Sequence, residues 1–383
     1  MEKFIKRQII LYGSGSVYVM QTQEEVFQYS DEIGPEKILY VYDPKTKLKG
    51  ILVVDNTVLG PAIGGTRMAP DISTEEIFRL ARAMTFKNAA ADILHGGGKS
   101  GIMADPESKN KYELVRAFAK GIEPITSYVP GPDMGTDEHC MTIVKEEIGR
   151  AIGLPRERGG IPLDEIGSTG YGVVVSTEVA CEYVLLDLSK ASVAVEGFGA
   201  VGKAVVKFLT EKGTRIVAVS DSKGAIYQPN GLDYEKLLKA KQTTGAVKNY
   251  KGGRIIGNEE LFRLPVDILI PGARPDVISK ENVRDVKASL VVEAANIPAT
   301  IEAEKILHDR GILVVPDFIA NAGGVITGAV EYMGGTENEV FGIIKDKITK
   351  NTKQVLDMAK AQKMLPRVAA ETLAKKRVLK AMK

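Results

Sequence analysis

Two lysines flank a run of three glycines in the first third of the chain, in a pattern that could support chemistry. Leu80, Met84, Lys87 and Ala91 follow one another at helical spacing, so Lys87 falls on the stripe where apolar residues would pack. The glycines then end the helix and deliver Lys99. An ammonium group held against apolar surface is costly unless it binds an anion or has a depressed pKa. A single such lysine would more often extend its ammonium into water, but the pair around the glycines favours a functional site.

The helix that carries Lys87 is expected to begin just after Ser73. Ser73 followed three residues later by Glu76 matches a capping box, in which each side chain binds the other residue's backbone amide. The glycines at 96–98 then predict a loop between this helix and the rest of the fold. Further elements expected in this half are strands at 38–42 and 51–54 joined by a turn at 43–47, a helix at 112–122, and a Gly- and Pro-rich boundary at 155–168.

Short β-rich runs alternate with helical stretches from Ser192 onward. Each run is apolar on consecutive residues, which suits strands buried on both faces. Helices alternating with such strands imply a parallel, doubly wound sheet, and small or polar residues follow the strands at the edge where such sheets bind ligands. The runs are 193–195, 216–219, 267–270, 290–292 and 312–315. We therefore expect an α/β protein of two domains separated by a cleft, the C-terminal one Rossmann-like, with a Lys-rich helical tail after about residue 335.

A dinucleotide-binding fingerprint follows the first of these strands. The pattern G-x-G-x-x-G opens a helix here, so its glycines would make the turn, bring the backbone close to a pyrophosphate and pack helix on strand. Its residues are Gly197, Phe198, Gly199, Ala200, Val201 and Gly202. Asp221 ends the next strand, where a ribose-binding carboxylate belongs, and it favours NAD. Ser222 and Lys223 follow at once and could bind the 2′-phosphate of NADP instead.

The composition limits the classes of protein to consider. The 383 residues suffice for two or three domains, and 44% hydrophobic with 26% charged residues is ordinary for a globular protein. A net charge of +2 gives no electrostatic case for binding nucleic acid or a membrane, and no apolar run is long enough to span a bilayer. Cys140 and Cys181 provide no disulfide framework, and no spacing of His, Cys and carboxylates suggests a metal site. A cytoplasmic protein is expected.

Several separate motifs make the chain similar to the Glu/Leu/Phe/Val dehydrogenases between Val58 and Glu331. They are residues 59–67 (LGPAIGGTR), 84–99, 131–136 (GPDMGT), 169–172 (TGYG), the fingerprint glycines and 321–324 (NAGG). Members of this family interconvert an L-amino acid with its 2-oxo acid and ammonia, using NAD or NADP. The resemblance thus implies an oxidoreductase. The alternatives from other classes are a non-catalytic nucleotide or amino-acid sensor that kept the fold, and a scaffolding protein.

The resemblance also implies roles for individual residues. Lys87 matches the lysine that holds the substrate α-carboxylate, and Lys99 matches the catalytic lysine that activates water. Asp133 matches the aspartate that moves a proton to and from the amino group. A lysine screened from water beside another cation has a lowered pKa, which suits general-base chemistry near neutrality. Beyond the fingerprint, the cofactor-binding positions are Thr169, Asp221, Ser222, Ala273, Ala295, Asn296 and Asn321.

Two positions bear on the choice of amino acid. In glutamate-selective members a lysine stands at the position of Ile63 and a serine or threonine at that of Gly328, and together they bind the side-chain carboxylate. A carboxylate facing Ile63 would be buried without a partner, at a cost of several kcal/mol, unless another cation such as Arg67 replaced the lysine. By resemblance the substrate site includes Ile63, Gly65, Gly131, Val325 and Gly328. Glycines at 131 and 328 imply a roomy pocket, so we expect an apolar L-amino acid, branched-chain or aromatic, with glutamate as the alternative.

The resemblance finally assigns functions to the parts of the chain. Residues 1–165 would form a substrate-binding and catalytic domain, which also carries the contacts between the subunits of a hexamer or octamer. Residues 166–330 would form the dinucleotide-binding domain, and 331–383 would form helices that pack back on the first domain. Because the lysines and the nicotinamide come from different domains, we expect the two to close on binding. His95 and His139 lie near the motifs and are given no role.

Overall fold

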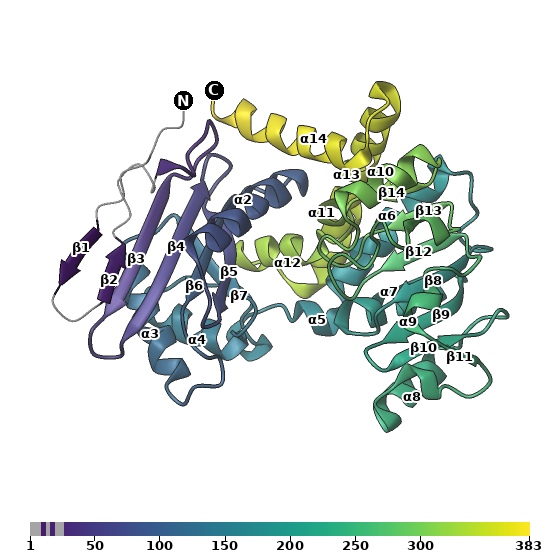
Figure 1. The fold of residues 1–383 in the computed structure, drawn as a ribbon, viewed down its shortest axis with the longest axis horizontal. Coiled ribbons are helices and arrows are strands. Elements are labelled where there is room, and N and C mark those ends of the chain that lie inside the picture. Colours follow the sequence, from purple (N-terminus) through teal and green to yellow (C-terminus); the bar gives the residue numbers. More distant parts are fainter. Residues whose placement is uncertain (1–8, 13–15, 20–26) are drawn as a thin grey trace.

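The computed structural model describes residues 9–12, 16–19 and 27–383, and it contains two α/β domains, each built around one sheet (Figure 1). The N-terminal sheet has the strand order β3-β4-β6-β5-β7. β4 runs antiparallel to β3 and β6, whereas β5 runs parallel to β6 and β7. The strands are β3 (Lys37–Asp43), β4 (Leu48–Asn56), β5 (Ala62–Met68), β6 (Gly96–Ile102) and β7 (Tyr128–Pro132), beside a separate antiparallel pair, β1 (Ile9–Tyr12) and β2 (Ser16–Val19). The predicted strands at 38–42 and 51–54 are confirmed as β3 and β4.

Helices cover both faces of this sheet, as the alternation along β4 makes clear. Leu52 and Val54 pack with residues of α3 (Lys111–Ile122) and α4 (Glu138–Ile148). Ile51 and Val53 pack instead with residues of α2 (Thr74–Ala90). Successive side chains of a strand point to opposite faces, so this consecutive apolar run is buried on both sides. The predicted helix at 112–122 is confirmed as α3.

The helix α2 begins where its capping residue predicts. Ser73 Oγ accepts a hydrogen bond from the backbone N–H of Glu76 at 3.1 Å, which caps the first turn. The carboxylate of Glu76 does not complete the expected capping box, because it binds Arg67 at 2.6 Å. The Ser73 side chain therefore caps the helix, whereas the Glu76 side chain binds Arg67 of the strand β5.

The glycines before Lys99 form the start of a strand, so the prediction of a loop at 96–98 was wrong. They open β6, the central strand of the N-terminal sheet. A Cβ on Gly97 would lie 2.0 Å from the backbone nitrogen of Thr85 in α2. Only glycine lets the helix lie this close to the strand, and this packing outweighs the low strand propensity of glycine.

The C-terminal sheet has the strand order β11-β10-β9-β8-β12-β13-β14. Its strands β9, β8, β12, β13 and β14 are parallel, which confirms the doubly wound sheet, but β10 and β11 form an antiparallel edge that the sequence did not predict. The strands are β8 (Ser192–Glu196), β9 (Arg215–Asp221), β10 (Gly224–Tyr227), β11 (Arg254–Ile256), β12 (Ile268–Pro271), β13 (Leu290–Val292) and β14 (Leu313–Val315). The chain passes from one sheet to the other between residues 132 and 192, and a boundary at 165 stays a prediction.

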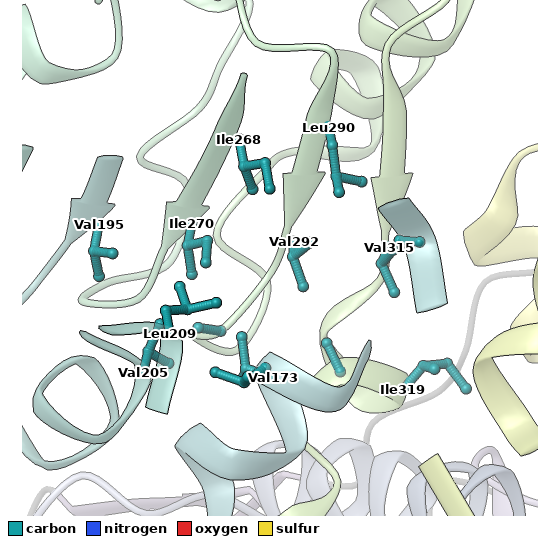
Figure 2. Packing of buried hydrophobic residues seen from close by; sticks show 14 of the residues in the cluster. Val173, Val195, Val205, Leu209, Ile268, Ile270, Leu290, Val292, Val315 and Ile319 are labelled. Carbon is teal, nitrogen blue, oxygen red and sulfur yellow. The ribbon is translucent and has the colours of Figure 1, made fainter. Parts of the chain in front are cut away.

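The core of this domain forms where the parallel strands meet two helices (Figure 2). Val195, Ile270 and Val292 come from neighbouring strands, and they pack with Val173 of α6 (Ser168–Tyr183) and Leu209 of α7 (Ala200–Glu211). Burying one such side chain contributes about 1.5–3 kcal/mol, so the cluster holds the strand ends rigidly. The shorter elements are α5 (Leu163–Ile166), α8 (Tyr234–Thr244), α9 (Asn258–Leu261), α10 (Ile301–Asp309), α11 (Asp317–Ala320), α12 (Gly323–Tyr332) and the 3₁₀ turns η1 (Arg156–Arg158), η2 (Val247–Asn249) and η3 (Val283–Asp285).

The tail folds into α13 (Glu337–Gln362) and α14 (Pro366–Ala381), as predicted, and α14 spans the space between the domains (Figure 1). Near one end of α14, Arg367 binds Glu293 of the C-terminal domain at 2.8 Å. Near the other end, Arg377 donates hydrogen bonds to the carbonyls of Ala89 and Ala90 at 2.8 and 2.9 Å. The helix thus ties the end of α2, which carries Lys87, to the Rossmann-like domain. None of the helices within the described ranges is long and apolar enough to cross a lipid bilayer.

The contact between α2 and β6 makes a prediction about stability. Gly97→Ala should lower the free energy of unfolding by about 1–3 kcal/mol, because its Cβ would overlap the backbone of α2. Gly342→Ala is the matched control, since Gly342 is exposed within α13 and a Cβ there would have nothing within 4 Å. That variant should gain about 0.5–1 kcal/mol from helix propensity. Urea unfolding followed by circular dichroism measures both, and a Gly97→Ala protein as stable as the parent would contradict the packing described.

Candidate active site

The central interaction of the site is an ion pair between Lys99 Nζ and Asp133 Oδ2. Lys99 lies in β6, Asp133 directly follows β7, and β5 runs between these two strands. Gly65 of β5 makes the contact possible, because a Cβ there would stand 2.8 Å from both Cβ and Oδ2 of Asp133. The side chains of Lys99 and Asp133 are only 8% and 15% exposed. The two residues that sequence analysis selected for catalysis are therefore in direct contact and shielded from water.

The carboxylate of Asp133 is surrounded by donors. Its Oδ1 accepts a hydrogen bond from the Met134 amide at 2.5 Å and lies 3.3 Å from the Arg67 guanidinium. Burial alone would raise the pKa of Asp133, but Lys99, the Met134 amide and Arg67 together lower it below its ordinary value. Thr136 Oγ1 fixes the turn, because it accepts the N–H of Asp133 at 2.9 Å and donates to a carbonyl of β5 at 2.8 Å. Asp133 is thus held in its ionised form.

Arg67 is committed to two carboxylates. Its guanidinium binds Glu76 at 2.6 Å and Asp133 at 3.3 Å. Burial alone would lower the pKa of Arg67, but these two carboxylates raise it. By its place in the sequence, Arg67 is the cation that could replace a lysine at position 63. In the structure its charge is neutralised by Asp133 and by Glu76 in the first turn of α2.

Lys87 lies in the last turn of α2, within electrostatic reach of both domains. Burial lowers its pKa, the carboxylate of Asp317 at the start of α11 opposes that shift, and the charge of Lys99 adds to it. The depressed pKa expected from two neighbouring lysines is therefore found at Lys87. A half-buried ammonium beside a second cation is stabilised by any anion that enters, which makes Lys87 a candidate for binding a carboxylate.

Ile63 lies two residues before Gly65 on β5, so its side chain is on the same face of the strand as the space that the Asp133 carboxylate occupies over Gly65. Ile63 of β5 lies opposite Val129 of β7 in the strand register, packs against it and is 3% exposed. Val325 and Gly328 of α12 are three residues apart and share one face of that helix. Val325 is partly buried against the apolar cluster that includes other residues of α12. Position 63 thus presents hydrocarbon, as predicted.

Ile152 lies against both glycines and takes up part of the room expected beside them. A Cβ on Gly131 would lie 3.1 Å from Ile152 Cγ1, and one on Gly328 would lie 2.8 Å from Ile152 Cδ1. Ile152 is 8% exposed and belongs to the same cluster as Ile63. Nothing in the sequence marks Ile152, because its neighbours Gly131 and Gly328 lie in two separate segments of the chain.

The dinucleotide fingerprint lies at the turn from β8 to α7, as predicted. Gly197 has φ +96° and packs so closely on Ala273 that a Cβ would lie 3.0 Å from the Ala273 Cβ. A Cβ on Gly202 would lie 1.9 Å from the carbonyl oxygen of Gly197, whereas one on Gly199 would meet nothing within 4 Å. No side chain of the described residues caps α7, so its first amides can bind a pyrophosphate that enters over Gly199. The other members are Phe198, buried in the core, and Ala200 and Val201, which open the helix.

Asp221 ends β9 as predicted, but its oxygens are already bound within the chain. Oδ1 accepts the Lys223 amide at 2.8 Å, and Oδ2 accepts Lys241 Nζ at 2.7 Å and the Val247 amide at 2.8 Å. Burial would raise the pKa of Asp221, and Lys241 with the two amides lowers it. Its charge is therefore neutralised by Lys241, which weakens the argument that it repels a 2′-phosphate. Ser222 lies beside it in the turn between β9 and β10.

The predicted nicotinamide end gathers residues from several loops. The Asn321 amide donates to Asn296 Oδ1 at 3.1 Å and to the Ala295 carbonyl at 3.3 Å. Among the described residues nothing donates to Asn321 Oδ1, which is buried and can accept a hydrogen bond from a bound group. The hydroxyl of Thr169 in α6 lies 2.9 Å from where a Cβ of Gly324 would stand, so the first turns of α6 and α12 meet there. These groups fit the polar end of a nicotinamide cofactor.

The two histidines without an assigned role have structural partners. His95 Nδ1 lies 3.0 Å from the carbonyl oxygen of Pro61, its ring packs edge-on against Tyr332, and burial lowers its pKa. His139 packs edge-on against Tyr112. Both contacts explain the conformation of the ring without a role in chemistry.

Comparison with known proteins gives family matches over both halves of the chain. The model described as Glutamate/Leucine/Phenylalanine/Valine dehydrogenase matches residues 159–383, and the one described as Glu/Leu/Phe/Val dehydrogenase, dimerisation domain, matches residues 35–150. The glutamate dehydrogenase of Aeropyrum pernix is 42% identical over 353 residues, which cover 86% of this chain and 84% of that protein. The NAD-specific glutamate dehydrogenase of Staphylococcus aureus is 35% identical over 347 residues, 85% of this chain and 83% of that one.

Solved structures share the whole fold. The hetero-hexameric glutamate dehydrogenase of Thermus thermophilus in a leucine-bound form superposes with a TM-score of 0.79 at 30% identity, over 91% of this chain and 89% of that one. The L-tryptophan dehydrogenase of Nostoc punctiforme gives 0.76 at 27% identity, over 94% and 100%. The agreement in sequence and architecture extends through both domains, and we conclude that this chain belongs to the Glu/Leu/Phe/Val dehydrogenase family of NAD(P)-dependent oxidoreductases.

Proposed function

We propose that this protein catalyses the oxidative deamination of an apolar L-amino acid to its 2-oxo acid and ammonia, and the reverse reductive amination. One observation carries the proposal. It is the buried Lys99–Asp133 pair beside Lys87, bordered by hydrocarbon at Ile63. The arrangement offers a cation for the α-carboxylate, a proton-transfer pair for the amino group, and an apolar wall for the side chain.

In the proposed mechanism Lys87 binds the α-carboxylate, and Asp133 accepts a proton from the substrate ammonium group. The lowered pKa of Asp133 keeps it ionised and able to take that proton near neutral pH. The fingerprint loop and Asn321 would hold NAD or NADP, which would supply the acceptor for the hydride that leaves Cα. Lys99 positions the water that adds to the resulting iminium carbon, and its charge stabilises the oxygen. Asp133 then returns its proton to the nitrogen, the C–N bond breaks with its electron pair leaving on ammonia, and the C=O bond forms as the added water loses its two protons, one to the departing ammonia and one to solvent.

The preference for an apolar side chain rests on Ile63 and Arg67. A glutamate side chain directed at Ile63 would place its carboxylate against hydrocarbon. Arg67, the nearest cation in sequence, is already bound to Glu76 and Asp133. An unpaired buried carboxylate costs several kcal/mol, which corresponds to orders of magnitude in kcat/KM. Leucine and valine meet no such penalty.

Glutamate is the second candidate, and the names of the relatives favour it. The Aeropyrum pernix and Staphylococcus aureus proteins are both named glutamate dehydrogenases, at 42% and 35% identity. Within one fold, however, substrate choice depends on a few side chains at the site. The Nostoc punctiforme neighbour has the same architecture, and its name, L-tryptophan dehydrogenase, refers to an apolar amino acid. The chemistry at Ile63 therefore decides our choice.

We also propose that the enzyme accepts NADP as well as NAD. Lys241 neutralises Asp221, and Lys223 follows in the next turn, so a 2′-phosphate would meet positive charge rather than a free carboxylate. The relatives include both NAD-specific and NADP-specific glutamate dehydrogenases.

A homo-oligomer working in the cytoplasm is the assembly and location that we propose. The match to a dimerisation domain covers residues 35–150, and the Thermus thermophilus structure is a hetero-hexamer. The edge strand β3 exposes Tyr40 and Tyr42, which a neighbouring subunit would cover. Cys140 and Cys181 are buried free thiols, which suits a reducing compartment.

A panel of amino acids tests the proposed reaction. Alanine, valine, leucine, phenylalanine and glutamate are assayed separately with NAD and with NADP, and reduced nicotinamide is followed by absorbance. Leucine or valine should give a kcat/KM at least about 100-fold above that of glutamate, because the glutamate carboxylate would be unpaired. No absorbance change with any amino acid would identify a sensor, and a higher kcat/KM for glutamate would defeat the pocket argument.

A variant at Ile63 serves as the internal control of this panel. Ile63→Lys supplies the missing cation and should raise the ratio of glutamate to leucine kcat/KM by at least about tenfold. Ile63→Met keeps the position apolar and should leave the ratio within about twofold. An unchanged ratio in a folded Ile63→Lys protein would mean that position 63 does not face the substrate side chain.

The lowered pKa of Lys87 predicts how carboxylate binding depends on pH. An amine-free analogue such as 4-methylpentanoate isolates this group, because the analogue has no amino group to titrate. Its competitive inhibition constant should be flat at low pH and rise about tenfold per pH unit once Lys87 loses its proton, at a pH below the ordinary lysine value of 10.5. Lys87→Met should abolish the pH dependence and weaken binding throughout. An inhibition constant that stays flat up to pH 10.5 in the parent enzyme would contradict the assignment.

A further inference from the structure

One side chain, Ile152, occupies the space left by two glycines from different parts of the fold. Gly131 comes from β7 of the N-terminal domain, and Gly328 comes from α12. A Cβ on Gly131 or Gly328 would lie 3.1 or 2.8 Å from a carbon of Ile152. Large side chains at all three positions would therefore clash. Gly131 lies two residues before Asp133. Whatever fills its side-chain space therefore borders the proton-transfer pair.

The backbone holds Ile152 in this place from both sides. Its N–H donates to the Pro130 carbonyl of β7 at 2.9 Å. The following segment is fastened to α12, because the Glu331 carboxylate accepts the amides of Leu154 and Ile161 at 3.1 and 3.2 Å. Ile152 thus sits on a segment that is attached to β7 at one end and to α12 at the other. These hydrogen bonds, together with the packing of Ile152 on Ile63 and Val129, fix its position.

We propose that Ile152 sets the size of the substrate side-chain pocket and restricts it to aliphatic amino acids. This inference rests on the proposed function and narrows its substrate class. Ile152 packs with Ile63 and Val129 in one apolar cluster, so it continues the wall that the substrate side chain would meet. A β-branched side chain is stiff at χ1 and makes a fixed wall rather than a movable one. Leucine and valine fit beside such a wall, whereas an aromatic ring would need the volume that Ile152 fills.

The inference accounts for the two glycines in a way that the sequence alone does not. Read by themselves, glycines at 131 and 328 indicate a wide pocket. In the structure both glycines leave room for the side chain of Ile152, and that side chain bounds the pocket. Because Ile152 lies between a glycine of β7 and a glycine of α12, its position also links pocket size to the distance between that strand and that helix.

Substitutions of opposite sign at this position test the inference. Ile152→Ala should raise the ratio of phenylalanine to valine kcat/KM by at least about tenfold, since it removes more than one methylene from the wall. Ile152→Phe should shift preference the other way, towards alanine over leucine, by a similar factor. Ile143→Ala is the matched control, because Ile143 is an equally buried isoleucine of α4 in the core away from the site. That variant should keep both ratios within about twofold of the parent.

The outcomes separate this inference from the function on which it rests. If the parent enzyme oxidises aliphatic amino acids and a folded Ile152→Ala protein keeps the parent ratio, the inference fails and the proposed reaction stands. If no amino acid supports the reduction of NAD or NADP by the parent enzyme, both the inference and the proposed reaction fail. Circular dichroism and the melting temperature show which variants fold. If Ile152→Ala does not fold, Ile152→Phe and the milder Ile152→Val provide the test. A shift of Ile152→Phe towards smaller substrates and of Ile152→Val towards larger ones would support the inference. Unchanged ratios in both variants would overturn it.

Discussion

The close approach of backbone segments around the Lys99–Asp133 pair is the constraint on which the rest of the site depends. Removing two charged groups from water costs several kcal/mol per ion, so such a pair needs well-defined geometry. Gly65 provides it by leaving space for the Asp133 carboxylate over β5, and Gly97 lets α2 rest on β6. That second contact brings Lys87 beside Lys99. The arrangement of three charged groups is therefore built into a sheet and a helix, and no flexible loop is needed to form it.

The two domains share responsibility for the site. The N-terminal sheet and α2 contribute Lys99, Asp133 and Lys87, whereas α11 contributes Asp317, which acts on the pKa of Lys87. The helix α14 fixes the relation between them, because Arg367 binds the C-terminal domain and Arg377 binds the end of α2. A change in the angle between the domains would alter the field at Lys87. Ile152 lies between Gly131 of β7 and Gly328 of α12, so the space around it depends on the distance between that strand and that helix.

The sequence predicted what depends on local pattern. Periodic apolar runs located the strands around β8 and the helix α3, and the fingerprint located the turn over Gly199. It failed where distant segments meet. The glycines of β6 resemble a loop until Thr85 is packed against Gly97, and Asp221 appears free until Lys241 and Val247 fold back on it. Ile152 carries no local signal, because its role arises from two glycines that only the fold brings together.

The most direct test of the central claim is a single-turnover measurement on Asp133→Asn. The substitution keeps the shape of the side chain but removes its charge and its capacity to carry a proton. Formation of reduced nicotinamide with saturating leucine should slow by about 10²–10⁴-fold, while inhibition by 4-methylpentanoate stays near that of the parent. Asp137→Asn, at the N-cap of α4 four residues away, should react at the parent rate because asparagine also caps helices. A rate for Asp133→Asn within a few-fold of the parent would contradict the account.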